Sequence, residues 1–145
     1  MIQLSFFALS AVEAIDRITA KTSAIGAMHL EKVRLDAASQ LRDSSQVAQS
    51  MQYLEAHRAD APDAYEGALI VVNDLDAAAN LLLERLLDKD QRTQALVDGQ
   101  TYAAPLRTPR QVEFNARWST VLARKDVRAA IHKVGRAEVY KLEER

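Results

Sequence analysis

The sequence contains no cysteine, so disulfide bonds, thiolate zinc sites and cysteine nucleophiles are excluded. Glycine and proline are scarce, with 4 and 3 residues in a chain of 145, and aromatic residues make up only 6%. Glycine and proline interrupt helices, whereas Ala, Leu, Arg, Glu and Gln favour them and are plentiful here. The composition therefore predicts an all-α protein.

The sequence also lacks a long apolar run. No stretch approaches the roughly 20 apolar residues that span a bilayer. The N-terminal segment MIQLSFFALSAVEAI has no preceding Lys or Arg, and Glu13 and Asp16 interrupt its apolar pattern, so it does not have the form of a signal peptide. We expect a soluble chain without membrane insertion, with the cytoplasm favoured and the periplasm open if the chain was cut from a longer protein.

Hydrophobic residues make up 48% of the chain, which is enough to form a core. We predict a single helical domain over residues 1–145, which would be a C-terminal fragment if Met1 is not the natural start. Apolar spacing places a first helix over residues 2–20, and Thr108-Pro109 is expected to open a helix that runs to about Arg124. Asp126 is expected to cap the last helix. Residues 101–109 are predicted to form a loop or an extended strap.

The most apolar part of the chain is Ala64–Leu87, AYEGALIVVNDLDAAANLLLERLL. It predicts two short helices joined by a polar turn at Asn73-Asp74. Both helices are apolar enough to need neighbours on more than one side. We therefore expect this hairpin to hold the fold together.

The stretch NDLDAAANLLLERLLD resembles the second helix of a tetratricopeptide repeat. Asn73-Asp74 matches the turn, Ala78 the small residue and Leu82 the bulky residue four positions later. Two positions depart from that pattern: Arg85 replaces a small residue and Asp90 replaces the closing proline. The motif does not recur upstream at an offset of 34 residues. The resemblance covers one degenerate unit.

Residues 110–145 are similar to the capping helices that close bacterial tetratricopeptide arrays, because a helix carrying Trp118 is followed by ARKDVRAAIHKVGR and a short tail. The resemblance implies a repeat-like array of antiparallel helical hairpins with about six or seven helices. A closed helical bundle is the alternative fold.

Charge is divided unevenly along the chain. Residues 1–106 carry 9 Lys and Arg against 15 Asp and Glu, whereas residues 107–145 carry 10 against 5. Arg110, Arg117 and Arg124 are spaced seven apart, hence on one helical face, and Arg128 follows on the next helix. This basic set has three interpretations: a solvated face, a surface for an acidic protein partner, or a nucleic-acid surface, of which the last is disfavoured.

The resemblance adds a second candidate surface. It implies that the first helix of the hairpin faces a groove that takes a partner, with Asp63, Gly67 and Ile70 on that face.

No motif for catalysis stands out. His29, His57 and His132 are isolated in sequence, with no HExxH pair, and no Gly-rich phosphate loop or GxSxG motif is present. We predict no catalytic residues, no metal site and no cofactor.

The leading hypothesis is a non-catalytic helical scaffold that binds another protein or another domain of its own chain. The alternatives are a sensory or regulatory domain that binds a small molecule between helices, and an enzyme with an unrecognised site. A scaffold predicts a shallow groove, a sensor predicts a closed pocket of several hundred Å³, and an enzyme predicts converging titratable groups.

Overall fold

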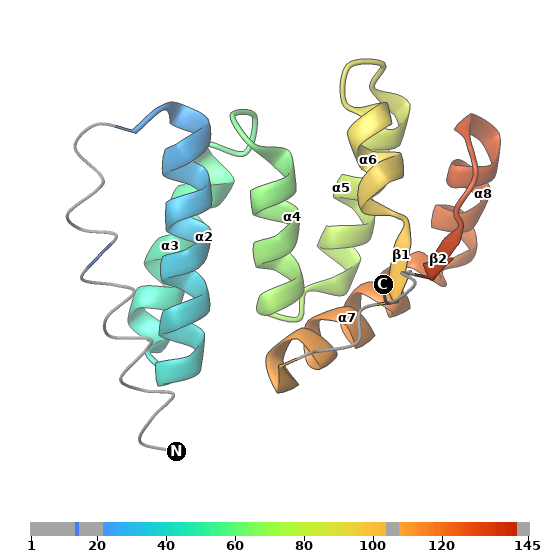
Figure 1. Cartoon of the computed structure of the whole chain (residues 1–145). Coiled ribbons are helices and arrows are strands. Elements are labelled where there is room, and N and C mark those ends of the chain that lie inside the picture. The colour runs from blue at the N-terminus through green and yellow to red at the C-terminus, as the bar shows by residue number, and fades with distance from the viewer. Residues whose placement is uncertain (1–13, 15–21, 104–107, 142–145) are drawn as a thin grey trace. The chain divides into compact units, whose positions relative to one another are not determined.

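The computed structural model describes residue 14, residues 22–103 and residues 108–141 (Figure 1). The predicted helix over residues 2–20 lies outside the described residues apart from Ala14. The described part contains seven helices and two three-residue strands, which confirms the all-α prediction and the helix number. The helices are α2 (Ala24–Leu41), α3 (Ser44–Ala56), α4 (Pro62–Val71), α5 (Leu75–Leu87), α6 (Arg92–Asp98), α7 (Pro109–Leu122) and α8 (Lys125–Val134).

Polar residues at the helix starts explain where several helices begin. Ser23, Asp43 and Asp74 each accept a hydrogen bond from a backbone N–H three residues later, at the starts of α2, α3 and α5. At the start of α7, Thr108 and Gln111 form a reciprocal capping box. The predicted start of α7 at Thr108-Pro109 is confirmed.

The chain forms two compact units, unit 1 (Met1–Val72) and unit 2 (Asn73–Arg145). The boundary falls between the two helices of the predicted hairpin. At this point Asn73 adopts a left-handed conformation with φ 64°, which asparagine tolerates better than most residues. The local turn predicted at Asn73-Asp74 is therefore present, and each unit is described separately below.

In the described part of unit 1, α2 packs against both α3 and α4 (Figure 1). Met28, Leu35 and Leu54 are completely buried. A polar network also lies inside this unit: the Ser50 hydroxyl donates to Glu31 at 2.6 Å, and Arg34 forms an ion pair with the same carboxylate. Because Glu31 is buried, these partners offset the cost of removing its charge from water.

In the described part of unit 2, α5 contacts α6, α7 and α8. The core contains Leu82, Leu86, Val121 and Val127, all fully buried. Trp118 is partly buried, and its indole N–H donates to the Asp98 carbonyl at 3.2 Å.

Two short strands complete unit 2. β1 (Thr101–Ala103) pairs in parallel with β2 (Val139–Lys141), so Thr101 lies opposite Val139. The Gln100 side chain joins the same two segments: its amide nitrogen donates to the Arg136 carbonyl, and its amide oxygen accepts from the Glu138 N–H at 2.7 Å. The residues after α8 are therefore held beside the end of α6. β1 lies at the start of residues 101–109, which were predicted to form a loop or an extended strap.

One predicted cap is wrong. Asp126 lies inside the first turn of α8, and Arg124 occupies the capping position. The prediction placed Arg124 at the end of α7, but that helix ends at Leu122. Arg124 therefore lies in the connection between the two helices.

Within the described ranges, none of the helices combines the length and the apolar character needed to cross a membrane.

Candidate functional site

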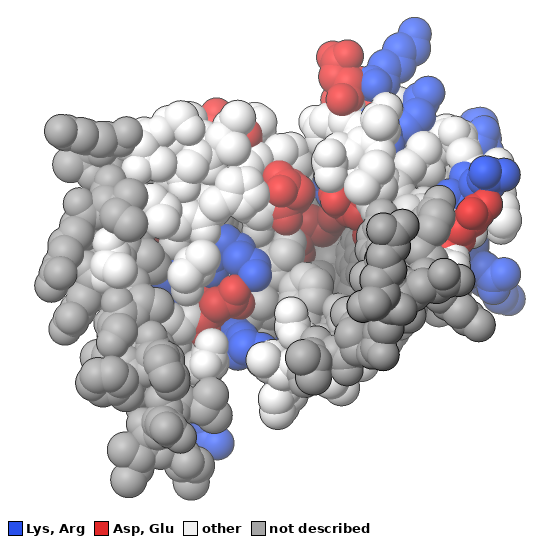
Figure 2. All heavy atoms as spheres, viewed as in Figure 1, with Lys and Arg blue, Asp and Glu red and all other residues white. Residues whose placement is uncertain are grey.

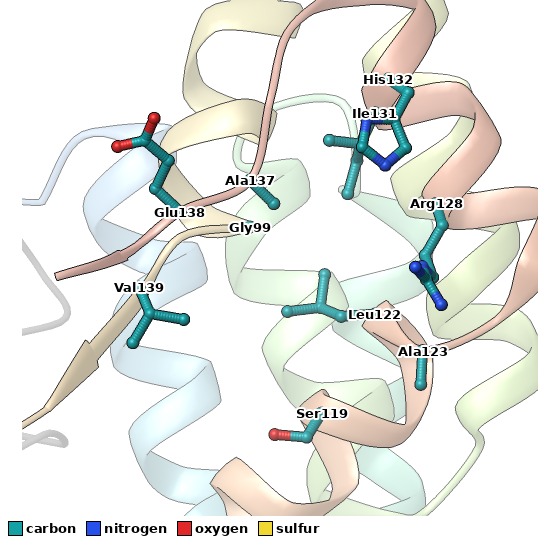
Figure 3. Close-up of a pocket in the computed structure, with 10 residues that line it drawn as sticks. All are labelled: Gly99, Ser119, Leu122, Ala123, Arg128, Ile131, His132, Ala137, Glu138 and Val139. Carbon is teal, nitrogen blue, oxygen red and sulfur yellow. The ribbon is translucent and has the colours of Figure 1, made fainter.

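The candidate site is a groove in unit 2 with a volume of about 400 Å³ (Figure 3). It lies between the C-terminal end of α7, one face of α8, and the segment after α8 that leads into β2. The lining residues are Gly99, Ser119, Leu122, Ala123, Arg128, Ile131, His132, Ala137, Glu138 and Val139. We call this feature the α7–α8 groove.

Much of the α7–α8 groove surface is apolar. Figure 3 shows the side chains of Leu122 and Ile131 extending toward one another, with Val139 on the segment that leads into β2. Ile131 is buried, whereas Val139 is 70% exposed. An exposed apolar side chain at the mouth of a groove with an apolar floor offers surface that a ligand can remove from water.

Two polar side chains lie on one wall. Arg128 and His132 are four residues apart on α8 and therefore share a face of that helix (Figure 3). Both are exposed. Arg128 carries a permanent positive charge with five N–H donors, and His132 provides at least one N–H donor in either protonation state.

The nearby carboxylates of unit 2 are engaged elsewhere. Glu138 accepts from Arg136 at 2.9 Å, and Figure 3 shows its side chain directed away from Arg128 and His132. Both oxygens of Asp126 accept from Arg124, at 3.1 and 2.8 Å. Within the described ranges, no carboxylate forms an ion pair with Arg128.

The segment after α8 forms one wall of the α7–α8 groove and passes close to α6 at Gly135. A Cβ atom added at Gly135 would lie 2.8 Å from Leu96 Cδ1, closer than carbon atoms pack. Glycine at this position lets the chain leave α8 against Leu96 and turn back along α6. Gln100 then fixes the following residues in the extended form that ends in β2.

The groove also contains Ser119, His132 and Glu138, three residue types used in hydrolytic triads. Among the described residues, no hydrogen bond joins any two of these side chains. A nucleophile and its base lie within hydrogen-bond reach in a triad, and these three side chains do not have that geometry in the described structure. Within the described ranges, no three His, Asp or Glu side chains are grouped so that they could hold a metal ion.

The three predicted residues of α4 lie on the side of the helix that faces α2. The Asp63 carboxylate is 3.8 Å from His29 Nε2, and a Cβ atom added at Gly67 would lie 3.4 Å from Lys32 Cε. Ile70 is only 1% exposed. In unit 1, therefore, Ile70 is buried, whereas Asp63 is exposed beside His29 of α2.

The predicted basic residues are divided among α7, α8 and the connection between these helices. Arg110 and Arg117 lie on α7, and Arg117 forms an ion pair with Glu113 one turn away. Arg124, outside α7, binds Asp76 of α5 at 2.6 Å as well as Asp126. Of the four predicted arginines, Arg128 is the one that lines the α7–α8 groove.

The connection between α7 and α8 contains two groups with shifted pKa values, Arg124 and Asp126. Hydrogen bonds from Arg124 lower the pKa of Asp126 from 3.8 to about 2, helped by a bond from the Val127 N–H, while the pKa of Arg124 is raised, chiefly by the same Asp126. Asp126 is therefore ionised at neutral pH and committed to Arg124, which leaves it out of the ligand chemistry of the groove.

Sequence reasoning missed the α7–α8 groove as a site. His132 was treated as an isolated histidine, and Val139 was not considered. One signal was present: Arg128, Ile131 and His132 follow the spacing of a single helical face. The position of the segment after α8 depends on the hydrogen bonds of Gln100 to Arg136 and Glu138. These residues are 36 and 38 positions from Gln100, so local spacing does not reveal the contacts.

No family model matches the chain, and neither a curated protein nor a solved structure does so.

Proposed function

We propose that the chain is a non-catalytic helical binding domain, and that a segment of another protein binds in the α7–α8 groove. The observation that carries this proposal is the groove itself, which is open, about 400 Å³ in volume and lined by Leu122, Ile131 and Val139. A groove of this kind takes one or two apolar side chains of a partner as anchors, and its polar rim fixes their orientation.

A small molecule bound between helices is the second candidate. The volume of the groove falls within the range of about 300–1,000 Å³ that is usual for small-molecule pockets. The protein partner is favoured because the groove is open at Val139, whereas small-molecule sites bury most of their ligand.

A groove-filling substitution tests the proposal. Ser119 is exposed and lines the groove, whereas its neighbour Thr120 is exposed and does not line it. We expect the wild-type chain to enrich peptides from a random library displayed on phage, Ser119→Trp to fail to retain them, and Thr120→Trp to retain them. Circular dichroism checks that both variants are folded.

Three results would contradict the proposal. The wild type could enrich no peptide, both tryptophan variants could retain the enriched peptides equally, or chemical-shift changes on peptide addition could fall outside α7, α8 and residues 137–139. This experiment does not depend on whether the chain is related to tetratricopeptide repeats, which remains a prediction.

A further inference from the structure

We infer that the α7–α8 groove selects partner segments in which an apolar side chain lies next to a carboxylate, with Arg128 and His132 contacting that carboxylate. The inference rests on the proposed function and specifies its ligand. The geometry places these two donors on the wall beside Ile131 (Figure 3). A ligand whose apolar group enters the groove therefore has its neighbouring atoms beside them.

The acidic side chains near Arg128 in sequence already have cationic partners. Arg124 holds Asp126, and Arg136 holds Glu138. Asp126 in the first turn of α8 and Glu138 four residues after that helix are thereby ion-paired. The guanidinium of Arg128 remains available in the described structure to a carboxylate brought by a ligand, and guanidinium–carboxylate pairs are among the strongest charge-assisted hydrogen bonds.

The segment that contains α8 also carries a net positive charge. Residues 124–138 contain five cations (Arg124, Lys125, Arg128, Lys133, Arg136) and two anions (Asp126, Glu138), a balance of +3. In Figure 2, Lys and Arg atoms gather on the side of unit 2 that α8 occupies. Such a field attracts acidic segments and repels basic ones during approach.

The groove surface favours a peptide over a nucleic acid. Among the described residues that line it, none is Phe, Tyr or Trp. Base stacking on aromatic side chains is the usual means of holding single-stranded nucleic acid, whereas Leu122, Ile131 and Val139 suit an aliphatic or aromatic side chain of a protein.

The test begins with the peptides that the wild-type chain enriches. We expect an Asp, a Glu or a free C-terminal carboxylate within two positions of a large apolar residue. Synthetic copies with the acidic residue changed to Asn or Gln, or with the C-terminus amidated, identify which carboxylate is bound. Removal of that carboxylate is expected to weaken binding about tenfold or more, as for other charge-assisted hydrogen bonds.

Two matched charge variants complete the test. Arg128→Gln removes the groove cation, and Lys133→Gln removes an exposed cation of α8 that does not line the groove. By titration calorimetry, Arg128→Gln should weaken binding about tenfold and Lys133→Gln less than about threefold. His132→Gln should give an intermediate loss.

The outcomes separate the two proposals. Enriched peptides that lack a carboxylate, or equal losses in Arg128→Gln and Lys133→Gln, would overturn the inference and leave the binding function intact. Failure to enrich any peptide would overturn both. Binding of a 20-nucleotide single-stranded DNA that is tighter than any peptide and depends on Arg128 would also refute the acidic-peptide inference.

Discussion

Asp98 joins three helices of unit 2 through one residue. Its carboxylate accepts from Arg85 of α5 at 2.6 Å and from Gln94 of α6 at 2.8 Å, while its backbone carbonyl accepts from Trp118 of α7. Arg85 is only 3% exposed. A tetratricopeptide repeat would have a small residue at this position, so the departure seen in the sequence corresponds to a buried ion pair in the structure.

Asp98→Ala is expected to lower the free energy of unfolding by about 2–4 kcal/mol, because it leaves the buried Arg85 guanidinium without this carboxylate. Urea denaturation measures the change. Glu84→Ala, at an exposed position of α5, is the control and should change stability by less than about 0.5 kcal/mol. A loss in Asp98→Ala no larger than that of the control would show that the pair contributes little.

At the scale of elements, Arg124 joins the start of α5 to the connection between α7 and α8. It contacts Asp76 near the start of α5 and Asp126 in the first turn of α8. The side chain that was expected to belong to a partner surface is therefore bound within unit 2. Substituting Arg110, Arg117 and Arg124 together would remove the ion pairs of Arg124 with Asp76 and Asp126. Arg128→Gln leaves both ion pairs in place and is therefore the better test of partner binding.

The lowered pKa of Asp126 predicts a pH effect. A carboxylate whose pKa is about 2 in the folded chain and 3.8 as a model value stabilises the fold above about pH 4, and this contribution disappears as the pH falls toward 2. We expect the stability difference between wild type and Asp126→Asn to be greatest above pH 4 and to shrink below it. Thermal unfolding from pH 6 to pH 2 measures the difference.

The control for this effect is Asp90→Asn, a change at an exposed aspartate after α5. Its difference from wild type should vary less with pH. A constant difference for Asp126→Asn across the whole range would contradict the predicted pH effect, because the carboxylate would then have the same pKa in the folded and unfolded chains.

At the scale of the whole molecule, the chain is built as two units with separate buried residues. Leu54 lies in the core of unit 1 and Leu82 in that of unit 2, and both are fully buried. The functional proposals involve unit 2 alone. The described residues that line the α7–α8 groove all belong to unit 2.

Leu54→Ala is expected to lower the opening free energy of amides in α2–α4 by about 2–5 kcal/mol, because it leaves a cavity in that core. Leu82→Ala should act in the same way on α5, α7 and α8. Hydrogen exchange measured by mass spectrometry separates the two sets of amides. Equal losses across both units in either variant would show that the chain unfolds as one cooperative body.

Much of the local structure could be predicted from the sequence. Ser23, Asp74 and Thr108 mark helix starts by a hydrogen bond that spans three residues, so the signal and its effect lie in the same short segment. Arg124 and Asp126 were assigned to the wrong positions because the two helices meet within three residues. Arg124, which lies between these helices, pairs with Asp126 two residues away and with Asp76 of α5.

The sequence by itself determined the all-α class and most of the helix starts, because apolar spacing and capping act over three to seven residues. Only the tertiary structure decided which surfaces are open. It buried Ile70 of α4, joined residues 136 and 138 to the end of α6 through Gln100, and placed Arg128 on the wall of a groove. These outcomes depend on contacts between residues far apart in the chain, which local spacing does not encode.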